Sequence, residues 1–396
     1  AAYYDDPAEA LNMVGITGTN GKTTTAYLVH HGLNAIGETA GLISTIEVRT
    51  RTLAVNAALT TPGPLELQRT LRRMVDDGCT ACAMEVSSHA LDQERTTPIA
   101  YDVALFTNLS TDHLDYHGST AAYKETKKQL FDDLPSDAIA IYNHDDEAGP
   151  AIVADTAARR QSYGTHPDSD IRIANIEVAL SGLSMQLDGR EVSFRLTGRF
   201  NAYNLAAAYG ALRACGAKAD AARQALASSP PVPGRFERLD LKGGPTVIVD
   251  YAHTPHALES ILQALRPLTP TNAQLWCIFG CGGDRDTGKR RLMGAIAESF
   301  ADRVIVTNDN PRTEDPQAIL NDIRRGMSRP GEAKWIPDRE SAIETAAKHA
   351  APDDLVLIAG KGHETYQIMG DERHAFDDRA VARRHFLAYH QSASLN

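Results

Sequence analysis

The sequence has no long apolar run and no excess of positive charge. None of its apolar stretches reaches the roughly 20 residues that a helix needs to cross a bilayer, and residues 1–7 lack the basic and apolar regions of a secretory signal. Lys and Arg number 40 against 51 Asp and Glu, which gives a formal net charge of −11. Broad binding to nucleic acid or to a membrane surface requires a basic face. We therefore expect neither a nucleic-acid partner nor membrane insertion.

Cysteine is scarce, and its five copies are scattered along the chain. An odd, scattered set is typical of a reducing compartment, so we expect a cytoplasmic protein. Cys79 and Cys82 form a C-x-x-C pattern. No second such pair accompanies it, and we interpret both residues as part of the core and not as a redox pair.

The sequence does contain a regular alternation of strand and helix patterns over 396 residues, too many for one ordinary core. This alternation predicts an α/β fold with largely parallel sheets. The run Ser228–Gly234 holds three prolines and a glycine and is the best linker candidate. Strands are predicted at 11–17, 82–86, 103–107, 247–250, 275–280, 303–308 and 355–359, helices at 23–33, 200–215, 255–265 and 288–300, and an antiparallel hairpin at 171–196 with its turn at Asp188-Gly189.

A glycine-rich loop lies between the first predicted strand and helix. It reads Gly18-Thr19-Asn20-Gly21-Lys22-Thr23-Thr24. Glycines allow backbone N–H groups to converge on phosphate oxygens at a helix N-terminus, where the helix dipole favours negative charge. Lys22 is suited to the outer phosphates, and Thr23 or Thr24 to Mg²⁺. The general phosphate-loop pattern has a glycine where this chain has Ile16, so we expect Gly18 to take its role.

This T-G-T-N-G-K-T-T loop resembles that of the Mur ligase family and its relatives, the folylpolyglutamate synthases and cyanophycin synthetases. Further segments carry the same resemblance, namely Met84–His89, Asn108–Asp115 and Tyr123–Lys127. The resemblance covers about residues 11–386. It implies a P-loop-type central ATPase domain with a mainly parallel sheet at 1–233 and a C-terminal Rossmann-like domain, which binds the incoming amino acid, at 234–396.

The resemblance also implies an ADP-forming ligase that joins a carboxylate to an amine through an acyl phosphate. Two anions must meet in that reaction, so divalent cations must screen them. The implied catalytic residues are Lys22, Glu85, His113 and Lys127. The implied ligands of Mg²⁺, of which two ions are expected, are Thr23, Glu85, His113 and Lys127. Lys127 matches the family lysine that CO₂ converts to a carbamate, because an unmodified ammonium would repel the metal.

Four residues further along match positions that hold the nucleotide. By the resemblance, the amide of Asn201 reads adenine, since its donor and acceptor complement the base edge. Arg235 would touch the ATP phosphates, Asp250 the ribose hydroxyls, and His253 would lie near the nucleotide. With residues 18–24, these form the predicted ATP site.

The motif Asp309-Asn310-Pro311-Arg312 resembles the acceptor motif of the MurE-type ligases that add meso-diaminopimelate in peptidoglycan synthesis. The distal end of that substrate carries both an ammonium and a carboxylate. Arg312 is suited to the carboxylate, and Asp309 or Asn310 to the ammonium. Lysine would leave Arg312 unpaired, which discriminates strongly against it. By the resemblance, Gly360 and Glu364 complete this site and Arg285 takes the second carboxylate.

The other substrate implied is a UDP-N-acetylmuramoyl-L-Ala-D-Glu precursor. The positions that match its binding site are Thr60, Thr61, Ser87, Gln93 and Arg95. MurE-type enzymes usually carry an N-terminal domain of roughly a hundred residues that holds the uridine diphosphate, whereas here the phosphate loop lies within the first two dozen residues. Either the chain is part of a longer protein, or it holds the nucleotide-sugar differently. We expect a truncated form to keep its ATP sites but to bind the nucleotide precursor poorly. We also expect a monomer.

Three alternatives stay open at this point. The closest is a MurE-type ligase that adds lysine or ornithine. A folylpolyglutamate synthase-like ligase also lacks a UDP domain, but the segments Thr60–Pro62 and Asp309–Arg312 count against it. A non-catalytic protein on a ligase fold would be expected to have lost Lys22, Glu85, His113 or Lys127, and all four are present.

Overall fold

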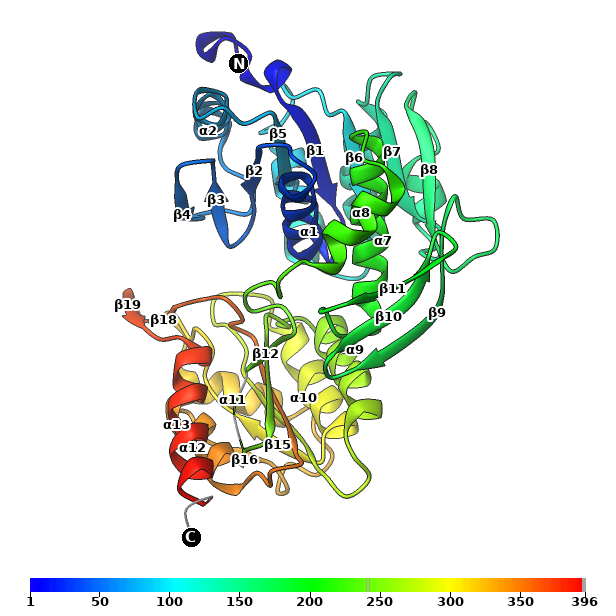
Figure 1. Cartoon of the computed structure of the whole chain (residues 1–396). Helices are drawn as coiled ribbons and strands as arrows, with labels where there is room; N and C mark the ends of the chain where they lie inside the picture. Colours follow the sequence, from blue (N-terminus) through cyan, green and yellow to red (C-terminus); the bar gives the residue numbers. More distant parts are fainter. Residues whose placement is uncertain (240, 242, 394–396) are drawn as a thin grey trace. The chain divides into compact units, whose positions relative to one another are not determined.

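The structure is a computed structural model that describes residues 1–239, 241 and 243–393. The chain divides into two compact units, Ala1–Pro230 and Pro231–Asn396. The division falls within the proline-rich segment Ser228–Gly234. Both units are mixed α/β, as the alternating sequence pattern predicted (Figure 1).

An eleven-stranded sheet forms the centre of unit 1, in the order β11-β10-β9-β8-β7-β6-β1-β5-β2-β3-β4. Its middle, from β9 to β2, is parallel, and the strands beyond are antiparallel. The strands are β1 (Asn12–Thr17), β2 (Ala40–Ile43), β3 (Glu47–Arg49), β4 (Ala54–Asn56), β5 (Ala81–Glu85), β6 (Val103–Phe106), β7 (Ile139–Asn143), β8 (Arg159–Gly164), β9 (Ile171–Ala179), β10 (Gly182–Leu187) and β11 (Arg190–Phe194).

Helices cover both faces of this sheet. Successive side chains of a strand point to opposite faces, so Val14 and Ile16 of β1 join one core with α1 and α7, while Met13 joins the other with α2 and α5. Figure 1 shows α1 and α7 side by side on the first face. The helices are η1 (Ala2–Tyr4), η2 (Pro7–Ala10), α1 (Lys22–Ala35), α2 (Pro64–Asp76), α3 (Ser88–Asp92), α4 (Leu114–His117), α5 (Thr120–Asp132), α6 (Gly149–Ile152), α7 (Arg199–Ala214) and α8 (Ala219–Ala227).

The segment predicted as one hairpin, 171–196, is a three-stranded meander. Asp188 and Gly189 do form the expected turn between β10 and β11, and both have positive φ. A second turn at 180–181 separates β9 from β10. The two turn residues, Leu180 and Ser181, are not the Asn or Gly types that indicate a hairpin turn. The glycine that follows, Gly182, already lies in β10.

Unit 2 contains a six-stranded sheet in the order β12-β13-β17-β14-β15-β16, in which only β12 is antiparallel to its neighbour. A small antiparallel pair, β18 and β19, follows it. The strands are β12 (Glu237–Leu239), β13 (Thr246–Asp250), β14 (Leu275–Phe279), β15 (Arg303–Val306), β16 (Lys334–Trp335), β17 (Leu355–Ala359), β18 (Tyr366–Met369) and β19 (Glu372–Ala375). The helices are α9 (Pro255–Leu265), η3 (Arg266–Leu268), α10 (Gly288–Phe300), α11 (Pro316–Arg324), α12 (Arg339–His349) and α13 (Asp378–Ala393).

The core of unit 2 positions the ends of its parallel strands. Val249, Ile278 and Ile358 pack from the sheet against Ile343 of α12 and Phe386 of α13. The carboxyl ends of β13, β14, β15 and β17 therefore lie along one edge, where ligands bind in open α/β sheets. Each of these strands is followed by residues that the sequence assigned to a binding site.

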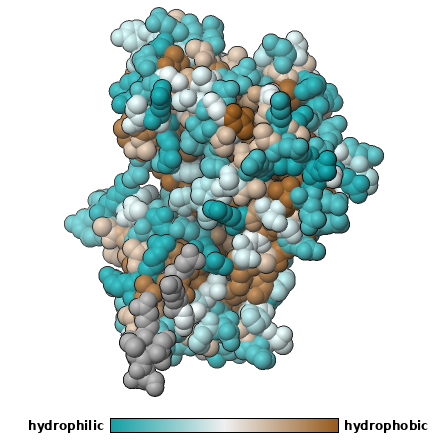
Figure 2. All heavy atoms as spheres, in the orientation of Figure 1, coloured by the Kyte–Doolittle hydropathy of each residue, from teal (hydrophilic) through white to brown (hydrophobic). Residues whose placement is uncertain are grey.

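The surface is mostly hydrophilic on the face drawn in Figure 2, with apolar residues in smaller areas between. Leu65 and Leu292 are exposed large apolar side chains. Such side chains are ordinary on a folded protein, and none of them supports a functional argument. Among the described residues, no helix is both long and apolar enough to span a membrane.

Candidate active site

The glycine-rich loop of unit 1 connects β1 to α1. Gly18 has φ of +141° and Gly21 has φ of +86°, a region that favours glycine. A Cβ on Gly18 would lie 1.9 Å from Thr107 Oγ1, and one on Gly21 would lie 2.4 Å from Asn204 Oδ1. The loop therefore requires glycine at both positions for space as well as for conformation.

The segment after β6 holds the loop in place. Thr19 donates its backbone N–H to the carbonyl of Asn108 at 2.8 Å, and Asn20 N–H donates to the Asn108 side-chain oxygen at 3.0 Å. Thr107 Oγ1 donates to the carbonyl of Asn20 at 2.7 Å. Two of the segments singled out in the sequence are thus in direct contact.

Two lysines converge on the loop. Lys22 Nζ donates to the carbonyls of Gly18 and Thr19, both at 2.8 Å, and Lys127 Nζ of α5 donates to the same Gly18 carbonyl at 2.9 Å. Lys127 is buried, and its pKa lies well below the ordinary lysine value. Burial is the main cause, repulsion from Lys22 adds to it, and Asp112 opposes it. The structure thus favours the neutral amine at Lys127.

Glu85 ends β5 and is fully buried. Thr45 holds its carboxylate, donating its N–H to Oε1 at 2.7 Å and its hydroxyl to Oε2 at 3.1 Å. The Thr60 hydroxyl oxygen lies at hydrogen-bond distance from Thr45 Oγ1, at 3.1 Å. Each Glu85 oxygen keeps a lone pair beyond these bonds.

The residues predicted for the nucleotide precursor form one connected group beside Glu85. Thr61 Oγ1 donates to the Glu85 carbonyl at 2.8 Å and accepts from Ser87 N–H at 3.0 Å. Arg95 donates to the Thr61 carbonyl at 2.9 Å and to Gln93 Oε1 at 2.9 Å. The sequence separated these residues by up to 35 positions, and the fold brings them together.

His113 lies on an irregular backbone at the start of α4, with φ of 54°. Loss of hydration lowers its pKa, and the Asp112 carboxylate opposes this shift. His89 lies next to His113 and His117 lies next to His89; the sequence left His89 and His117 without a role. Their rings lie 4.8 Å apart for His89 and His113, and 5.6 Å for His89 and His117. His117 also contacts Ser88 Oγ at 3.0 Å.

No group of three or more His, Cys, Asp or Glu side chains is placed to hold a metal in the described part of the chain. Glu85 and His113 are two of the predicted ligands, and the remaining ones are Thr23 and Lys127. Thr23 and Lys127 are not His, Cys, Asp or Glu, so the predicted metal site needs ligands of other residue types as well.

Asn201, predicted to read adenine, lies on α7 with its amide turned inward. It donates to the Thr197 carbonyl at 2.7 Å and accepts from Asn204 at 2.8 Å. Asn204 in turn lies against Gly21 and accepts from Thr25 Oγ1 at 3.4 Å. Asn201 thus braces α7 against the loop, and its role toward adenine stays a prediction.

In unit 2, the residues predicted for the nucleotide gather around Tyr251, at the end of β13. The Arg235 guanidinium lies 4.5 Å from the Tyr251 ring, and His253 Nδ1 is 2.8 Å from the Tyr251 carbonyl. Asp250 accepts backbone N–H bonds from Phe236 at 2.6 Å and Ala252 at 2.8 Å. Burial raises the pKa of Asp250, and Arg235 opposes this rise.

The acceptor motif follows β15, and the segment 360–364 follows the neighbouring β17. Asn310 Nδ2 donates to Glu364 Oε2 at 3.0 Å, and Asn310 Oδ1 accepts from Ile368 N–H at 3.0 Å. Gly360 lies against Asp309, because a Cβ there would be 2.6 Å from Asp309 Oδ2. These predicted residues therefore form one group.

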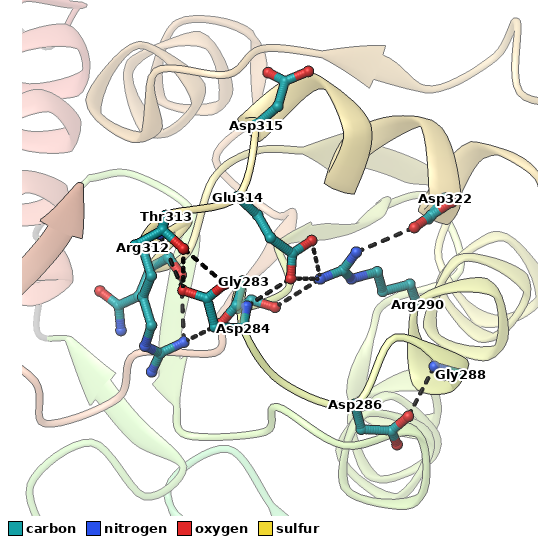
Figure 3. Close-up of polar contacts among 12 residues, drawn as sticks. Gly283, Asp284, Asp286, Gly288, Arg290, Arg312, Thr313, Glu314, Asp315 and Asp322 are labelled. Carbon is teal, nitrogen blue, oxygen red and sulfur yellow. Dashed lines mark hydrogen bonds and ion pairs between the residues drawn. The ribbon is translucent and has the colours of Figure 1, made fainter. Parts of the chain in front are cut away.

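The second glycine loop, residues 280–288, joins this group through Arg312 (Figure 3). Arg312 has φ of 52° and donates to the Gly283 carbonyl at 2.6 Å. A Cβ on Gly282 would lie 2.9 Å from Arg312 and 3.9 Å from Arg285 Cγ, so both arginines border the same glycine. Arg285 is exposed.

Sequence reasoning missed the ion pairs that hold this loop. Arg290, buried at the start of α10, donates to both Glu314 oxygens at 2.8 Å and to Asp322 at 3.1 Å (Figure 3). Glu314 also accepts from Asp284 N–H at 2.6 Å. Glu314 thereby ties the loop with Arg285 to the turn with Arg312. In the sequence, the run of basic residues 289–291 after Gly288 was the one sign that a cation here holds the loop.

Comparison with known proteins matches both units. Residues 16–212 match the family "Mur ligase middle domain" and residues 234–362 match "Mur ligase, glutamate ligase domain". The chain is 45% identical, over 96% of its own length and 80% of the relative's, to a UDP-N-acetylmuramoyl-L-alanyl-D-glutamate–2,6-diaminopimelate ligase of Geobacillus kaustophilus. A ligase of the same name from Thermosynechococcus vestitus is 46% identical, over 97% and 78%.

Solved structures agree. A structure of a UDP-N-acetylmuramoyl-L-alanyl-D-glutamate–2,6-diaminopimelate ligase superposes with a TM-score of 0.68 at 35% identity, over 96% of this chain and 79% of that one. Mycobacterium tuberculosis folylpolyglutamate synthase, in complex with ADP, shares the fold with a TM-score of 0.74 at 21% identity, over 91% and 90%. The resemblance drawn from the phosphate loop and its companion segments is therefore confirmed, and the chain belongs to the Mur ligase family of ATP-dependent, ADP-forming amide ligases.

Proposed function

We propose that this enzyme adds meso-diaminopimelate to UDP-N-acetylmuramoyl-L-Ala-D-Glu, with ATP as the energy source, in peptidoglycan synthesis. The observation that carries the choice of acceptor is the arrangement of charge in unit 2. Arg312 lies in one group with Asp309 and Glu364, next to Arg285. Such a group complements an amino-acid head that bears both an ammonium and a carboxylate.

The free hydrogen-bonding capacity of these side chains fits that ligand. Glu364 uses only Oε2 within the protein, and its Oε1 has no donor among the described residues. Within the described part of the chain, the Arg312 side chain donates through NH1 alone, which leaves its Nε and NH2 groups available to a carboxylate. In contrast, the side-chain oxygen of Asn310 already accepts two hydrogen bonds, from Ile368 N–H and from Lys361. Because its Nδ2 donates to Glu364, we propose that Asn310 holds Glu364 in position.

In the first step, an oxygen of the D-Glu carboxylate attacks the γ-phosphorus of ATP, and ADP leaves. The α-amine of diaminopimelate then attacks the acyl carbon; the C–N bond forms, phosphate leaves and the amine loses a proton. Thr60, Thr61, Ser87, Gln93 and Arg95 would hold the precursor beside Glu85. Residues 18–24 would hold the phosphates, with Lys22 at the outer ones and Arg235 also touching them. Asn201 would read the adenine, Asp250 would bond the ribose hydroxyls, and His253 would lie near the nucleotide.

The donor set of unit 1 fits Mg²⁺. Glu85 offers carboxylate lone pairs, and the lowered pKa of His113 keeps its imidazole neutral. The low pKa of Lys127 favours the amine, the form that reacts with CO₂ to give a carbamate. We propose this carbamate as a further ligand and Thr23 as another. When bound, the two ions we expect would supply positive charge between carboxylate and triphosphate.

We further propose that residues 1–233 act as the ATP-binding domain and 234–396 as the acceptor domain, and that the enzyme works in the cytoplasm as a monomer. The test of the reaction is turnover with ATP, Mg²⁺ and the UDP-linked dipeptide, with meso-diaminopimelate, L-lysine or L-ornithine offered in parallel. Phosphate release and the product mass should show clear preference for meso-diaminopimelate. Equal or better use of lysine or ornithine would contradict the acceptor assignment.

A further inference from the structure

A fully buried lysine lies within the proposed acceptor group. Lys361 follows β17, and none of its side chain is exposed to solvent. Its Nζ donates to Glu364 Oε2 at 2.9 Å and to Asn310 Oδ1 at 3.1 Å, and it lies 3.9 Å from Asp309 Oδ1. The protein's own ammonium thus contacts the same acceptors that the sequence assigned to the ammonium of the substrate.

The position of Lys361 changes the charge that a ligand meets. Without it, Asp309 and Glu364 would present two negative charges beside Arg312, since Arg285 is assigned to the second carboxylate of the substrate and the buried Arg339 is paired with Asp378. With it, the acidic side of the group carries a net charge of −1 and Arg312 carries +1. That balance corresponds to one ammonium and one carboxylate, which is the charge pattern of a zwitterionic amino-acid head.

Lys361 also determines which carboxylate oxygens remain for a ligand. It occupies Glu364 Oε2 together with Asn310 Nδ2, so Oε1 is left without a donor among the described residues. Among the described residues, no side chain donates a hydrogen bond to Asp309; Lys361 Nζ lies 3.9 Å from its Oδ1, and the Asp309 side chain is 9% exposed. Two nearly buried carboxylates are thereby held near each other with capacity for one further ammonium.

We propose that Lys361 is a specificity-determining residue, which sets the charge of the acceptor site so that a zwitterionic acceptor head is preferred over a purely cationic one. This inference rests on the proposed function, because it concerns the same site. Specificity is a difference between two affinities. Removing the charge of Lys361 makes the site more negative, which favours the lone ε-ammonium of lysine relative to the neutral head of meso-diaminopimelate.

The test compares Lys361→Met with the wild type, measuring kcat/KM for meso-diaminopimelate and for L-lysine on one enzyme preparation. We expect the ratio of the two constants to fall about tenfold or more, because lysine gains relative to diaminopimelate. A loss of correctly folded enzyme lowers both constants equally and cancels in the ratio. An unchanged ratio, with or without a loss of both activities, would overturn the proposal.

Two further variants support this comparison. Lys348→Met removes an exposed lysine of α12 in the same unit and should leave the ratio unchanged. Lys361→Gln removes the charge but keeps an amide that donates hydrogen bonds, and it carries the test if Lys361→Met does not fold. If the wild type adds neither amino acid, the proposed function fails, and Lys361 loses its assignment with it. If the wild type adds diaminopimelate and only the ratio fails to move, the inference alone is wrong.

Discussion

Lys127 in unit 1 and Lys361 in unit 2 are both buried lysines beside a glycine-rich segment, yet their surroundings are opposite. Lys127 Nζ meets a backbone carbonyl and is repelled by Lys22. Lys361 Nζ meets the carboxylate of Glu364, with Asp309 close by. The partners of a buried lysine, and not its burial alone, therefore decide what the side chain does. One site favours a neutral, reactive amine, and the other holds a fixed cation.

The largest effect expected from this contrast is on turnover. Lys127→Met should lower kcat about a thousandfold, because it removes the group that we propose as the metal-binding carbamate. Phosphate release with all substrates present measures it. Lys128→Met is the matched control, since Lys128 pairs with Asp132 and Asp155 at the surface and should be dispensable. A severe loss from Lys128→Met with normal turnover from Lys127→Met would reverse the assignment.

The same substitution at Lys361 should act on stability. Lys361→Met leaves Glu364 and Asp309 without their cation, and breaking a buried pair costs about 3 kcal/mol of unfolding free energy. Denaturant unfolding of Lys361→Met and Lys127→Met, each compared with the wild type, would measure this loss of unfolding free energy. Equal stability of Lys361→Met and the wild type would mean that this ammonium contributes no net stabilisation.

Arg290 extends the comparison to a third buried cation. Glu314→Ala should cost about 2 kcal/mol, because the buried guanidinium keeps only Asp322 as an anionic partner. It should also raise KM for diaminopimelate more than it lowers kcat, since the loop with Arg285 loses its tie to Arg312. Glu332→Ala, at an exposed pair with Arg329, is the control. A change in kcat alone would show that Glu314 does not position the acceptor.

The contribution of Glu314 to stability should also depend on pH. Its pKa is lowered, mainly by the hydrogen bonds from Arg290. Its stabilising contribution is therefore fully present above the ordinary value of 4.5 and is lost as the pH falls through the lower folded value. Glu314→Ala should accordingly narrow its stability difference from the wild type in strongly acidic buffer. A difference that stays constant to low pH would show that this ion pair does not titrate as described.

The smallest effect expected is a gain in stability. Lys127→Met should stabilise the protein by about 1 kcal/mol in bicarbonate-free buffer, since it removes a buried amine. The unfolded lysine binds a proton that the folded one does not. Wild-type stability should therefore rise with pH toward 10.5 from the lower folded pKa, and the variant should lack this rise. A destabilised variant would show that Lys127 is an important structural donor.

The sequence predicted helices and strands best where residues that favour the start or end of an element are present. Pro255 at the start of α9, with Thr254 capping it, is an example, and the helix begins and ends where predicted. The second turn of the meander was missed because Leu180-Ser181 carries no turn residues. Likewise, Lys361 and Arg290 look like surface cations in the sequence, since Asn310 and Glu314 are 51 and 24 positions away and the nearby Glu364 does not by itself indicate burial. Only the folded chain shows that they are buried.

The backbone contacts of Arg312 have a consequence for how acceptor preference can diverge among related enzymes. Arg312 N–H donates to the Ile368 carbonyl at 3.2 Å, and the Arg312 carbonyl accepts from Gly370 N–H at 2.7 Å. The β18–β19 hairpin thus holds the backbone of Arg312 through both its N–H and its carbonyl. Insertions or deletions at that turn would shift the guanidinium while Asp309–Arg312 stay identical. A change in the length of this hairpin would thus alter acceptor binding in a way that a motif search would overlook.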